Sequence, residues 1–277
     1  MKLGLIDYFL DEYHANHYPE WIKEASGGEI QALYAYAEID SPSGGMTTAR
    51  WCEAHGVQRL GSIEELIEKS DGIIVLSPDH PERHEELCQL PMRSGKRVYV
   101  DKTFAETKES AQRIFALATA HGTPCYSSSA LRYAAEFTGI DRGRVENIAS
   151  WGPGPLGGYS IHQIEPVVAL MGPELVRAQY IGTEKWPAYV CEYADGRRAV
   201  ITHHGWDCPF GMAIGHQGGE TVHVTVKSDF FRDFIAELAD FFRTGEIKVP
   251  HGETIAVIAA REAAIKAAQA PGQWIDV

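Results

Sequence analysis

The segment Val98-Tyr-Val-Asp101-Lys102 places an acid and a lysine directly after a short apolar run. The apolar run predicts a buried strand, and the residues after it predict a turn into a helix. Open α/β sheets bind ligands at the carboxyl ends of their parallel strands. A partly desolvated lysine at such a position can hold a substrate hydroxyl or take part in proton transfer. Lys102 is therefore the first candidate for a catalytic residue.

A second polar group follows the first predicted strand and consists of Asp7, Asp11, Glu12, His14 and His17. Three interpretations stay open. The group is a charged, exposed helix start, since acids near a helix N-terminus are favourable. It is a polar site for a sugar or another neutral ligand. Or it binds a divalent metal through oxygen and nitrogen ligands, although no standard ligand spacing is present.

Three further polar segments are candidates for substrate contacts. Residues 127–133 carry serines and Arg132, which suit either a polar or anionic substrate or an ordinary hinge. His162 opens a predicted helix after a glycine-rich loop and is either catalytic or a cap. His203 and His204 follow a predicted strand. Because adjacent residues on a strand face opposite ways, we expect at most one of this pair to point into a pocket.

Composition limits the class of protein. A chain of 277 residues, 44% of them hydrophobic, is long enough for two domains. Its formal net charge of −13 argues against nucleic acid or an anionic membrane surface as a partner. We find no run of about 18 apolar residues and no signal-peptide pattern, so we expect a soluble cytoplasmic protein. Five scattered cysteines without a C-x-x-C pair fit reduced structural thiols.

Strand and helix signals alternate over residues 1–125. Strands are predicted at 3–6, 32–39, 71–77 and 96–100, and helices at 18–25, 47–55, 62–70, 84–94 and 108–120. Ser62 and Glu65 match a capping box at the start of one helix. This alternation predicts a Rossmann-like, doubly wound parallel sheet.

The pattern changes after Pro124. Residues 152–158 predict a loop, and residues 160–171 a helix. Alternating segments follow at 177–182, 189–193, 199–204 and 220–226, with a hairpin signal at Asp195-Gly196. Helices are predicted at 230–242 and 253–270. We expect an α+β domain with an open, mostly antiparallel sheet.

Five segments carry a family resemblance over nearly the whole chain. They are residues 53–66 with Ser62-Ile-Glu-Glu-Leu66, residues 71–78 followed by His84, residues 94–102 with Gly95-Lys96 and Asp101-Lys102, residues 157–165 with His162 and Glu165, and the closing helices with Glu262-Ala263. In this order they resemble the Gfo/Idh/MocA oxidoreductases, which include glucose-fructose oxidoreductase and inositol dehydrogenase.

The resemblance implies a Rossmann-like domain over residues 1–125 that holds NAD or NADP. It implies an α+β domain over residues 126–277 that lines a sugar or polyol site and supports a homo-oligomer. Packing of the C-terminal helix back on the first domain stays open.

The resemblance also assigns roles to residues. Lys102 and His162 would face the reacting carbon, with His162 as base and Lys102 steadying the developing alkoxide. The residues implied at the cofactor cleft are Asp7, Phe9, Glu38, Ser77, Pro78 and Asp101. Those implied at the substrate are Arg132, Tyr159, Glu165 and His204.

The turn after the first strand departs from the family pattern. Members carry G-x-G-x-x-G there, whose amides and helix N-terminus cradle the pyrophosphate. Here Asp7, Phe9 and Glu12 stand at the glycine positions. One carboxylate about 4–5 Å from a phosphate costs about 3–4 kcal/mol at a dielectric near 20, or roughly two to three decades of affinity. Ordinary dinucleotide binding conflicts with this turn.

Two other positions depart from the family pattern. Gly158 stands where the family has a catalytic aspartate, so His162 lacks that acid unless Glu165 or Tyr159 substitutes. Thr103 stands where the family has proline. Because a cis bond before a non-proline residue costs about 3 kcal/mol, we expect a trans peptide there.

These observations predict an NAD(P)-dependent oxidoreductase that acts on a sugar, polyol or related hydroxy compound. A cofactor-free or metal-assisted lyase, hydrolase or isomerase on the same fold is the first alternative. A non-catalytic sugar-binding protein is the second.

Overall fold

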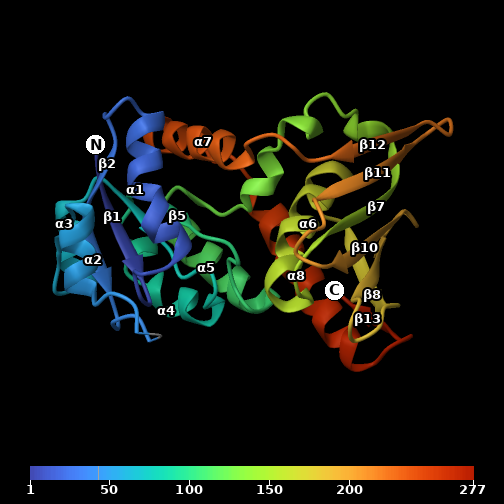
Figure 1. Cartoon of the computed structure of the whole chain (residues 1–277), viewed down its shortest axis with the longest axis horizontal. Coiled ribbons are helices and arrows are strands. Elements are labelled where there is room, and N and C mark those ends of the chain that lie inside the picture. The colour runs from blue at the N-terminus through green and yellow to red at the C-terminus, as the bar shows by residue number, and fades with distance from the viewer. Residues whose placement is uncertain (43) are drawn as a thin grey trace. The chain divides into compact units, whose positions relative to one another are not determined.

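The computed structural model describes residues 1–42 and 44–277. The chain folds into two compact units, whose elements are labelled in Figure 1. The first unit comprises Met1–Ser128 and Phe234–His251, and the second comprises Ser129–Asp233 and Gly252–Val277. Each unit is therefore built from two separate stretches of the chain, and each has its own sheet.

The sheet of the first unit has six parallel strands in the order β3-β2-β1-β4-β5-β6. Their bounds are β1 (Lys2–Asp7), β2 (Gln31–Ala37), β3 (Gln58–Arg59), β4 (Gly72–Val75), β5 (Arg97–Val100) and β6 (Cys125–Tyr126). Strands β1, β4 and β5 are almost wholly buried, as continuous apolar runs predict. The strand order reverses between β1 and β4, which is where doubly wound sheets bind ligands.

The helices of the first unit begin and end largely where the sequence signals lie. They are α1 (Tyr13–Ala25), α2 (Thr48–His55), α3 (Ile63–Lys69), η1 (Pro81–Arg83), α4 (His84–Leu87), η2 (Pro91–Arg93), α5 (Lys108–Ala120) and most of α7 (Phe230–Thr244). Ser62 accepts a hydrogen bond from the Glu65 amide at 3.2 Å, which confirms the predicted N-cap of α3. Helix α2 ends at Gly56, whose φ of 63° suits glycine.

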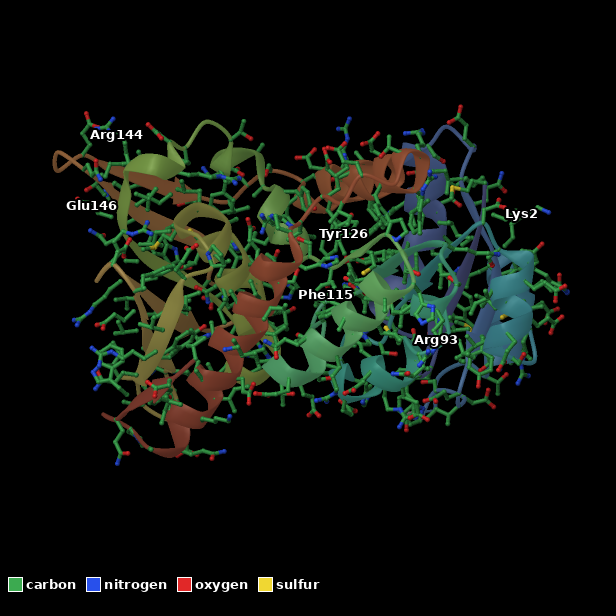
Figure 2. The ribbon with its side chains drawn as sticks, turned by 180° about the vertical axis from the view of Figure 1, so that it is seen from behind. Lys2, Arg93, Phe115, Tyr126, Arg144 and Glu146 are labelled. Atoms are coloured by element: carbon green, nitrogen blue, oxygen red, sulfur yellow. The ribbon has the colours of Figure 1, made fainter. Side chains whose placement is uncertain are left out.

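Helix α7 completes the core of the first unit. The ring of Phe234 packs against Tyr18 and Tyr99, with centroids 6.0 and 5.5 Å apart. A Cβ atom added at Gly72 would lie 2.8 Å from the ring of Phe242, so glycine permits this close approach. Figure 2 labels Phe115 and Tyr126, two further buried aromatic residues of this unit.

The second unit contains a seven-stranded sheet in the order β12-β11-β7-β10-β9-β8-β13. Only β7 and β10 pair in parallel, so the sheet is mixed and mostly antiparallel. Helix α6 packs on β7 and β10. The strands are β7 (Val145–Pro153), β8 (Leu175–Tyr180), β9 (Ala188–Tyr193), β10 (Arg198–His204), β11 (Gly211–His216), β12 (Thr221–Thr225) and β13 (Trp274–Asp276). The helices are η3 (Ala130–Tyr133), η4 (Ala135–Phe137), η5 (Arg142–Arg144), α6 (Leu156–Met171) and α8 (His251–Gln269).

The predicted fold class is confirmed in both units, but some elements differ. Residues 152–158, predicted as a loop, end β7 and begin α6. Residues 84–94 form two short helices instead of one, because Pro91 has no amide hydrogen to continue α4. Strands β7 and β11 are missed, since Glu146 and Asn147 in one and two glycines in the other interrupt the apolar alternation.

Candidate functional site

Three neighbouring strands of the first unit end in polar residues. Asp7 ends β1, Ser77 follows β4, and Asp101 follows β5. Because β4 lies between β1 and β5 and all three are parallel, these ends meet at one edge of the sheet. We call Asp7, Glu12, His14, Ser77 and Asp101 the strand-end cluster. The sequence predictions placed Asp7, Ser77 and Asp101 at one cleft, and the structure brings them together.

Asp101 is fully buried and accepts hydrogen bonds on both oxygens. Its Oδ2 pairs with His14 Nδ1, and its Oδ1 accepts from the Tyr99 hydroxyl at 3.3 Å and the Lys102 amide at 2.8 Å. Burial alone would raise the pKa of Asp101, but the charge and hydrogen bond of His14 outweigh it and hold that pKa below its usual range. Asp101 is therefore a carboxylate whose oxygens are already bound by hydrogen-bond donors of His14, Tyr99 and Lys102.

The Lys102 side chain is 12% exposed and lies over the turn that follows β4. Its Nζ donates to the Pro78 carbonyl at 3.4 Å and lies 3.7 Å from the exposed carboxylate of Asp79. The Lys102–Thr103 peptide is cis, so the trans bond expected from the sequence is wrong. The expectation rested on the general rarity of cis bonds before non-proline residues, and this peptide is an exception to it.

Asp7 and Ser77 form the opposite part of the strand-end cluster. The Ser77 hydroxyl donates to Asp7 Oδ1 at 2.8 Å and accepts from the Tyr8 amide at 2.9 Å. Asp7 Oδ2 is buried without a hydrogen-bond partner among the described residues. Burial, and then the charge of Glu12, raise the pKa of Asp7 well above its usual value. Ser77 has φ of 74°, a strained value for a residue other than glycine.

Glu12 is the N-cap of α1. Its carboxylate accepts from the His14 amide at 2.7 Å and also from the Ala15 amide. Burial raises the pKa of Glu12 to about 7, against the opposing effects of the His14 charge and these two amides. The imidazole of His14 stacks on the Tyr18 ring, with centroids 4.9 Å apart. The start of α1 is thus packed with acids and an imidazole.

These residues do not fit a dinucleotide bound in the ordinary Rossmann manner. That manner uses free amides at the start of α1 and glycines that let the phosphates approach the backbone. Here Glu12 takes two of the amides, and the buried carboxyl of Asp7 stands in the turn. Phe9 packs edge-on against His80, with ring centroids 5.6 Å apart.

The predicted ribose partner, Glu38, is also engaged. It follows β2, and its Oε2 accepts from Arg83 Nε at 3.0 Å and Nη2 at 2.6 Å. The Arg83 guanidinium lies over the Tyr8 ring at 5.3 Å. A bound ribose would have to displace this ion pair.

A metal centre is not supported by the part of the chain that the structure describes. Over residues 1–42 and 44–277, no group of three or more His, Cys, Asp or Glu side chains could hold a metal ion. Within the same residues, no helix is long and apolar enough to cross a membrane.

His162 lies in α6 of the second unit. Its Nδ1 is 2.8 Å from the Ser129 hydroxyl, which also caps η3. Of the two residues considered as substitutes for the family's aspartate, Tyr159 lies edge-on to the imidazole with centroids 5.0 Å apart. The other, Glu165, binds Arg132. Ser129 at Nδ1 fixes the orientation of the His162 ring.

Arg132 is held between two carboxylates. Its Nη1 donates to Glu165 Oε1 at 3.2 Å, and its Nη2 pairs with Glu253. Burial alone would lower the pKa of Arg132, but the two carboxylates outweigh it and raise that pKa. We call Arg132, Glu165 and Glu253 the arginine triad. The roles of Arg132 and Glu165 as substrate ligands remain predictions. Each of these side chains already pairs with a side chain of opposite charge.

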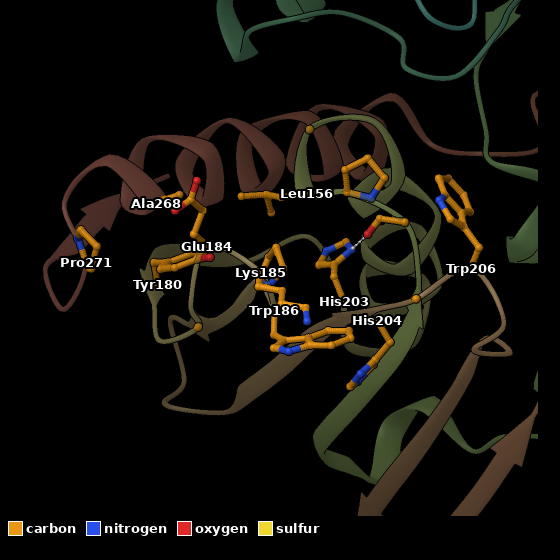
Figure 3. Close-up of a pocket in the computed structure, with 16 residues that line it drawn as sticks. Leu156, Tyr180, Glu184, Lys185, Trp186, His203, His204, Trp206, Ala268 and Pro271 are labelled. Carbon is orange, nitrogen blue, oxygen red and sulfur yellow. Dashed lines mark hydrogen bonds between the residues drawn. The ribbon is translucent and has the colours of Figure 1, made fainter.

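The second unit also contains a hollow of about 860 Å³ (Figure 3). Its lining includes Leu156, Tyr180, Trp186, His203, His204 and Trp206. His203 donates from Nδ1 to the Gly154 carbonyl at 3.0 Å, and burial lowers its pKa to about 4. Both His203 and His204 line the hollow, although His203 is buried and His204 is exposed, as expected for adjacent residues that face opposite ways. β10 ends at His204, so the hollow lies at the end of the strand instead of on one face.

The sequence patterns did not indicate several of the partners in these sites. Tyr18 is four residues after His14, one helical turn, so the helical period could have indicated it. Glu253 lies 121 residues from Arg132, and no local pattern connects them. Arg83 was likewise not linked to Glu38, because β2 and β4 come to lie on either side of β1 only in the folded sheet.

The first domain matches a known family. Residues 12–128 match the family model of the Gfo/Idh/MocA proteins, described as an oxidoreductase family with an NAD-binding Rossmann fold. The match begins at Glu12, after β1 and most of the turn in which the glycine signature is expected. A search of curated proteins finds no match.

Several solved structures share the fold of this chain over nearly its whole length. A myo-inositol dehydrogenase from Lactobacillus casei in complex with NAD(H) and myo-inositol has a TM-score of 0.80 at 13% identity, and covers 100% of this chain and 96% of its own. A UDP-N-acetylglucosamine 3-dehydrogenase from Acidithiobacillus ferrooxidans has a TM-score of 0.75 at 14% identity, with 98% and 97% covered. GenD2 from gentamicin A biosynthesis in complex with NAD has a TM-score of 0.80 at 15% identity, with 100% and 96% covered.

At these identities the solved structures establish the fold alone, and the family model matches only residues 12–128. Residues 12–128 of the chain are similar to the Gfo/Idh/MocA oxidoreductase family, and the whole length of the chain has the fold of the solved dehydrogenases.

Proposed function

We propose that this protein is an enzyme that acts at a hydroxyl-bearing carbon of a sugar, polyol or related compound, as an oxidoreductase. The family match supports the reaction class. The inositol and UDP-N-acetylglucosamine dehydrogenases of similar fold support the substrate class. The observation that carries the proposal is Lys102, a largely buried ammonium at the carboxyl end of β5 directly after buried Asp101.

Lys102 is proposed as the catalytic residue of the first unit. Its ammonium would donate to a substrate hydroxyl and stabilise the negative charge that develops as the hydroxyl loses its proton. Asp101 accepts from the Lys102 amide and so fixes the backbone from which the side chain extends. The Pro78 carbonyl steadies the ammonium itself.

His162, in the second unit, is proposed as a general base. Imidazole suits this role because its unperturbed pKa is about 6.5. Ser129 holds the ring through Nδ1, and Tyr159 packs against it. At Gly158, where the family has its aspartate, an added Cβ would meet no atom within 4 Å.

NAD or NADP is the redox partner that the family implies, but the ordinary cradle does not fit it. One observation favours a second candidate, in which the same residues act without a dinucleotide in a lyase, hydrolase or isomerase. That observation is the Glu12 carboxylate on the α1 amides. A homo-oligomer formed through the second unit is also proposed, and light scattering of the purified protein tests it.

One assay separates the two candidates. Purified protein is incubated with inositols, aldoses and sugar acids, with and without NAD⁺ or NADP⁺, while substrate is followed by NMR and reduced nicotinamide by absorbance. Substrate loss that requires NAD⁺ or NADP⁺ supports the oxidoreductase. Loss without either supports the second candidate.

Lys102→Ala is expected to slow the detected reaction about a hundred- to thousandfold, because the charge stabiliser is gone. Lys69→Ala removes an exposed lysine of α3 and serves as the control. Undiminished turnover by Lys102→Ala would contradict the proposal for either candidate.

A further inference from the structure

The start of α1 is the place where a Rossmann sheet binds a pyrophosphate. Amides of the first helical turn point outward there and carry the positive end of the helix dipole. In this chain the Glu12 carboxylate already accepts from two of them, the amides of His14 and Ala15. The carboxyl group of Glu12 therefore occupies the amides that a bound phosphate would use.

The neighbours of Glu12 make this place still less suitable for a phosphate. Asp7 is buried beside it, and the charges of these two acids interact. Asp101 adds a buried carboxylate whose charge acts on both of these acids. A single carboxylate about 4–5 Å from a phosphate weakens binding by roughly a hundred- to thousandfold. His14 cannot offset this, because its Nδ1 is already paired with Asp101.

Adjacent positions are filled as well. Glu38, which could hold a ribose hydroxyl, is bound by Arg83, and Arg83 in turn covers the Tyr8 ring. The side chain of Phe9 stands where close approach of a phosphate requires glycine. Glu12, Phe9 and the Glu38–Arg83 pair therefore all occupy places along β1 and β2 that a dinucleotide would need.

We propose that Glu12 permanently takes the pyrophosphate position of the first unit. This chain then binds neither NAD, NADP nor another nucleotide diphosphate at α1 in the manner of its fold. The ligand accepted at this edge of the sheet is neutral or cationic and carries no phosphate there. This inference goes beyond the proposed function, and it favours the second candidate, which needs no dinucleotide.

The test is calorimetric titration of the full chain with ADP-ribose and, separately, with inorganic pyrophosphate. Three proteins are compared: wild type, Glu12→Ala and Thr107→Ala. Thr107 caps α5 in the same unit by accepting from the Ser110 amide at 3.2 Å. Its variant therefore loses a helix cap without opening the start of α1.

Wild type and Thr107→Ala are expected to show no saturation below about 1 mM with either ligand. Glu12→Ala frees the α1 amides and is expected to bind pyrophosphate at least about tenfold more tightly than wild type. Saturation of wild type below about 1 mM overturns the proposal. An equal response of Glu12→Ala and Thr107→Ala also overturns it.

Glu12→Gln covers the case in which Glu12→Ala does not fold. It keeps an oxygen that can cap the helix and removes only the charge. Pyrophosphate binding at least about tenfold tighter than in wild type is expected, and unchanged binding counts against the proposal. Because the readout is binding and not turnover, its result is independent of the outcome for Lys102→Ala.

Discussion

The two units each bury a cluster of charged side chains, and the clusters differ in their balance. In the second unit the arginine triad sets one guanidinium between two carboxylates, and each group has a direct partner. In the first unit the strand-end cluster holds the buried carboxyl groups of Asp7 and Asp101 and the partly buried one of Glu12, and Asp101 is paired with the His14 imidazole. Two of those three, Asp7 and Glu12, have raised pKa values.

This difference separates a structural role from a functional one. A paired buried charge is costly to break but holds nearby segments together. Unpaired buried acids destabilise the folded state, and proteins keep them mainly where proton transfer or ligand binding needs them. The comparison therefore predicts a holding role for the arginine triad and a chemical role for the strand-end cluster.

The largest effect is expected from breaking the arginine triad. Arg132→Ala leaves Glu165 and Glu253 without their shared cation, and Glu165 is buried. We expect a loss of about 3–5 kcal/mol in the free energy of unfolding, measured by urea denaturation. Arg198→Ala removes a more exposed ion pair and should cost at most about 1 kcal/mol. A loss below about 1 kcal/mol for Arg132→Ala would remove the contrast between the clusters.

The second prediction concerns pH and the strand-end cluster. The pKa of Glu12 is 4.5 in the unfolded chain and about 7 in the folded one. Its stabilising contribution is therefore fully present below pH 4.5 and is lost as the pH rises through about 7. The free energy of unfolding of wild type minus that of Glu12→Gln should fall by on the order of 3 kcal/mol across this window.

Glu85 is the control of opposite sign. The Arg113 bond lowers the pKa of Glu85 to about 2, with burial opposing it. Its contribution is present above pH 4.5 and is lost as the pH falls toward 2. The difference between wild type and Glu85→Gln should therefore stay flat between pH 4.5 and 7. A flat curve for Glu12→Gln as well would show that Glu12 is solvated like a surface acid.

The smallest effect is expected at Ser77. Ser77→Ala leaves Asp7 Oδ1 and the Tyr8 amide without this partner, at a cost of about 2 kcal/mol. Ser77→Gly loses the same bonds but accepts the φ of 74° without strain. We expect the glycine variant to be at least as stable as the alanine variant in thermal unfolding. The reverse order would show that the backbone relaxes when the hydroxyl is removed.

Local patterns predicted much of this molecule. The apolar runs of β1, β4 and β5 indicated buried parallel strands, and the edge where Asp7, Ser77 and Asp101 meet follows from that assignment. The N-cap of α3 followed from Ser62 and Glu65. The acids at the glycine positions indicated a disturbed phosphate turn, and the fold places them there.

Contacts between distant segments could not be predicted in the same way. The pairs Asp101 with His14, Glu38 with Arg83, and Arg132 with Glu253 join residues 87, 45 and 121 positions apart. Each depends on which strands become neighbours and on side-chain direction, neither of which a periodic pattern contains. The sequence indicated polar groups at these places, but not that they satisfy one another.

The return of the chain to the first unit has a consequence for its synthesis. Phe234, Leu238, Phe241 and Phe242 of α7 are buried in that unit, although more than a hundred residues separate them from Ser128. On the ribosome, the first unit therefore cannot complete its core until nearly the whole chain has emerged. A chain cut after Ser128 would expose Tyr18 and Tyr99, which pack on Phe234 in the complete protein, and should aggregate instead of folding alone.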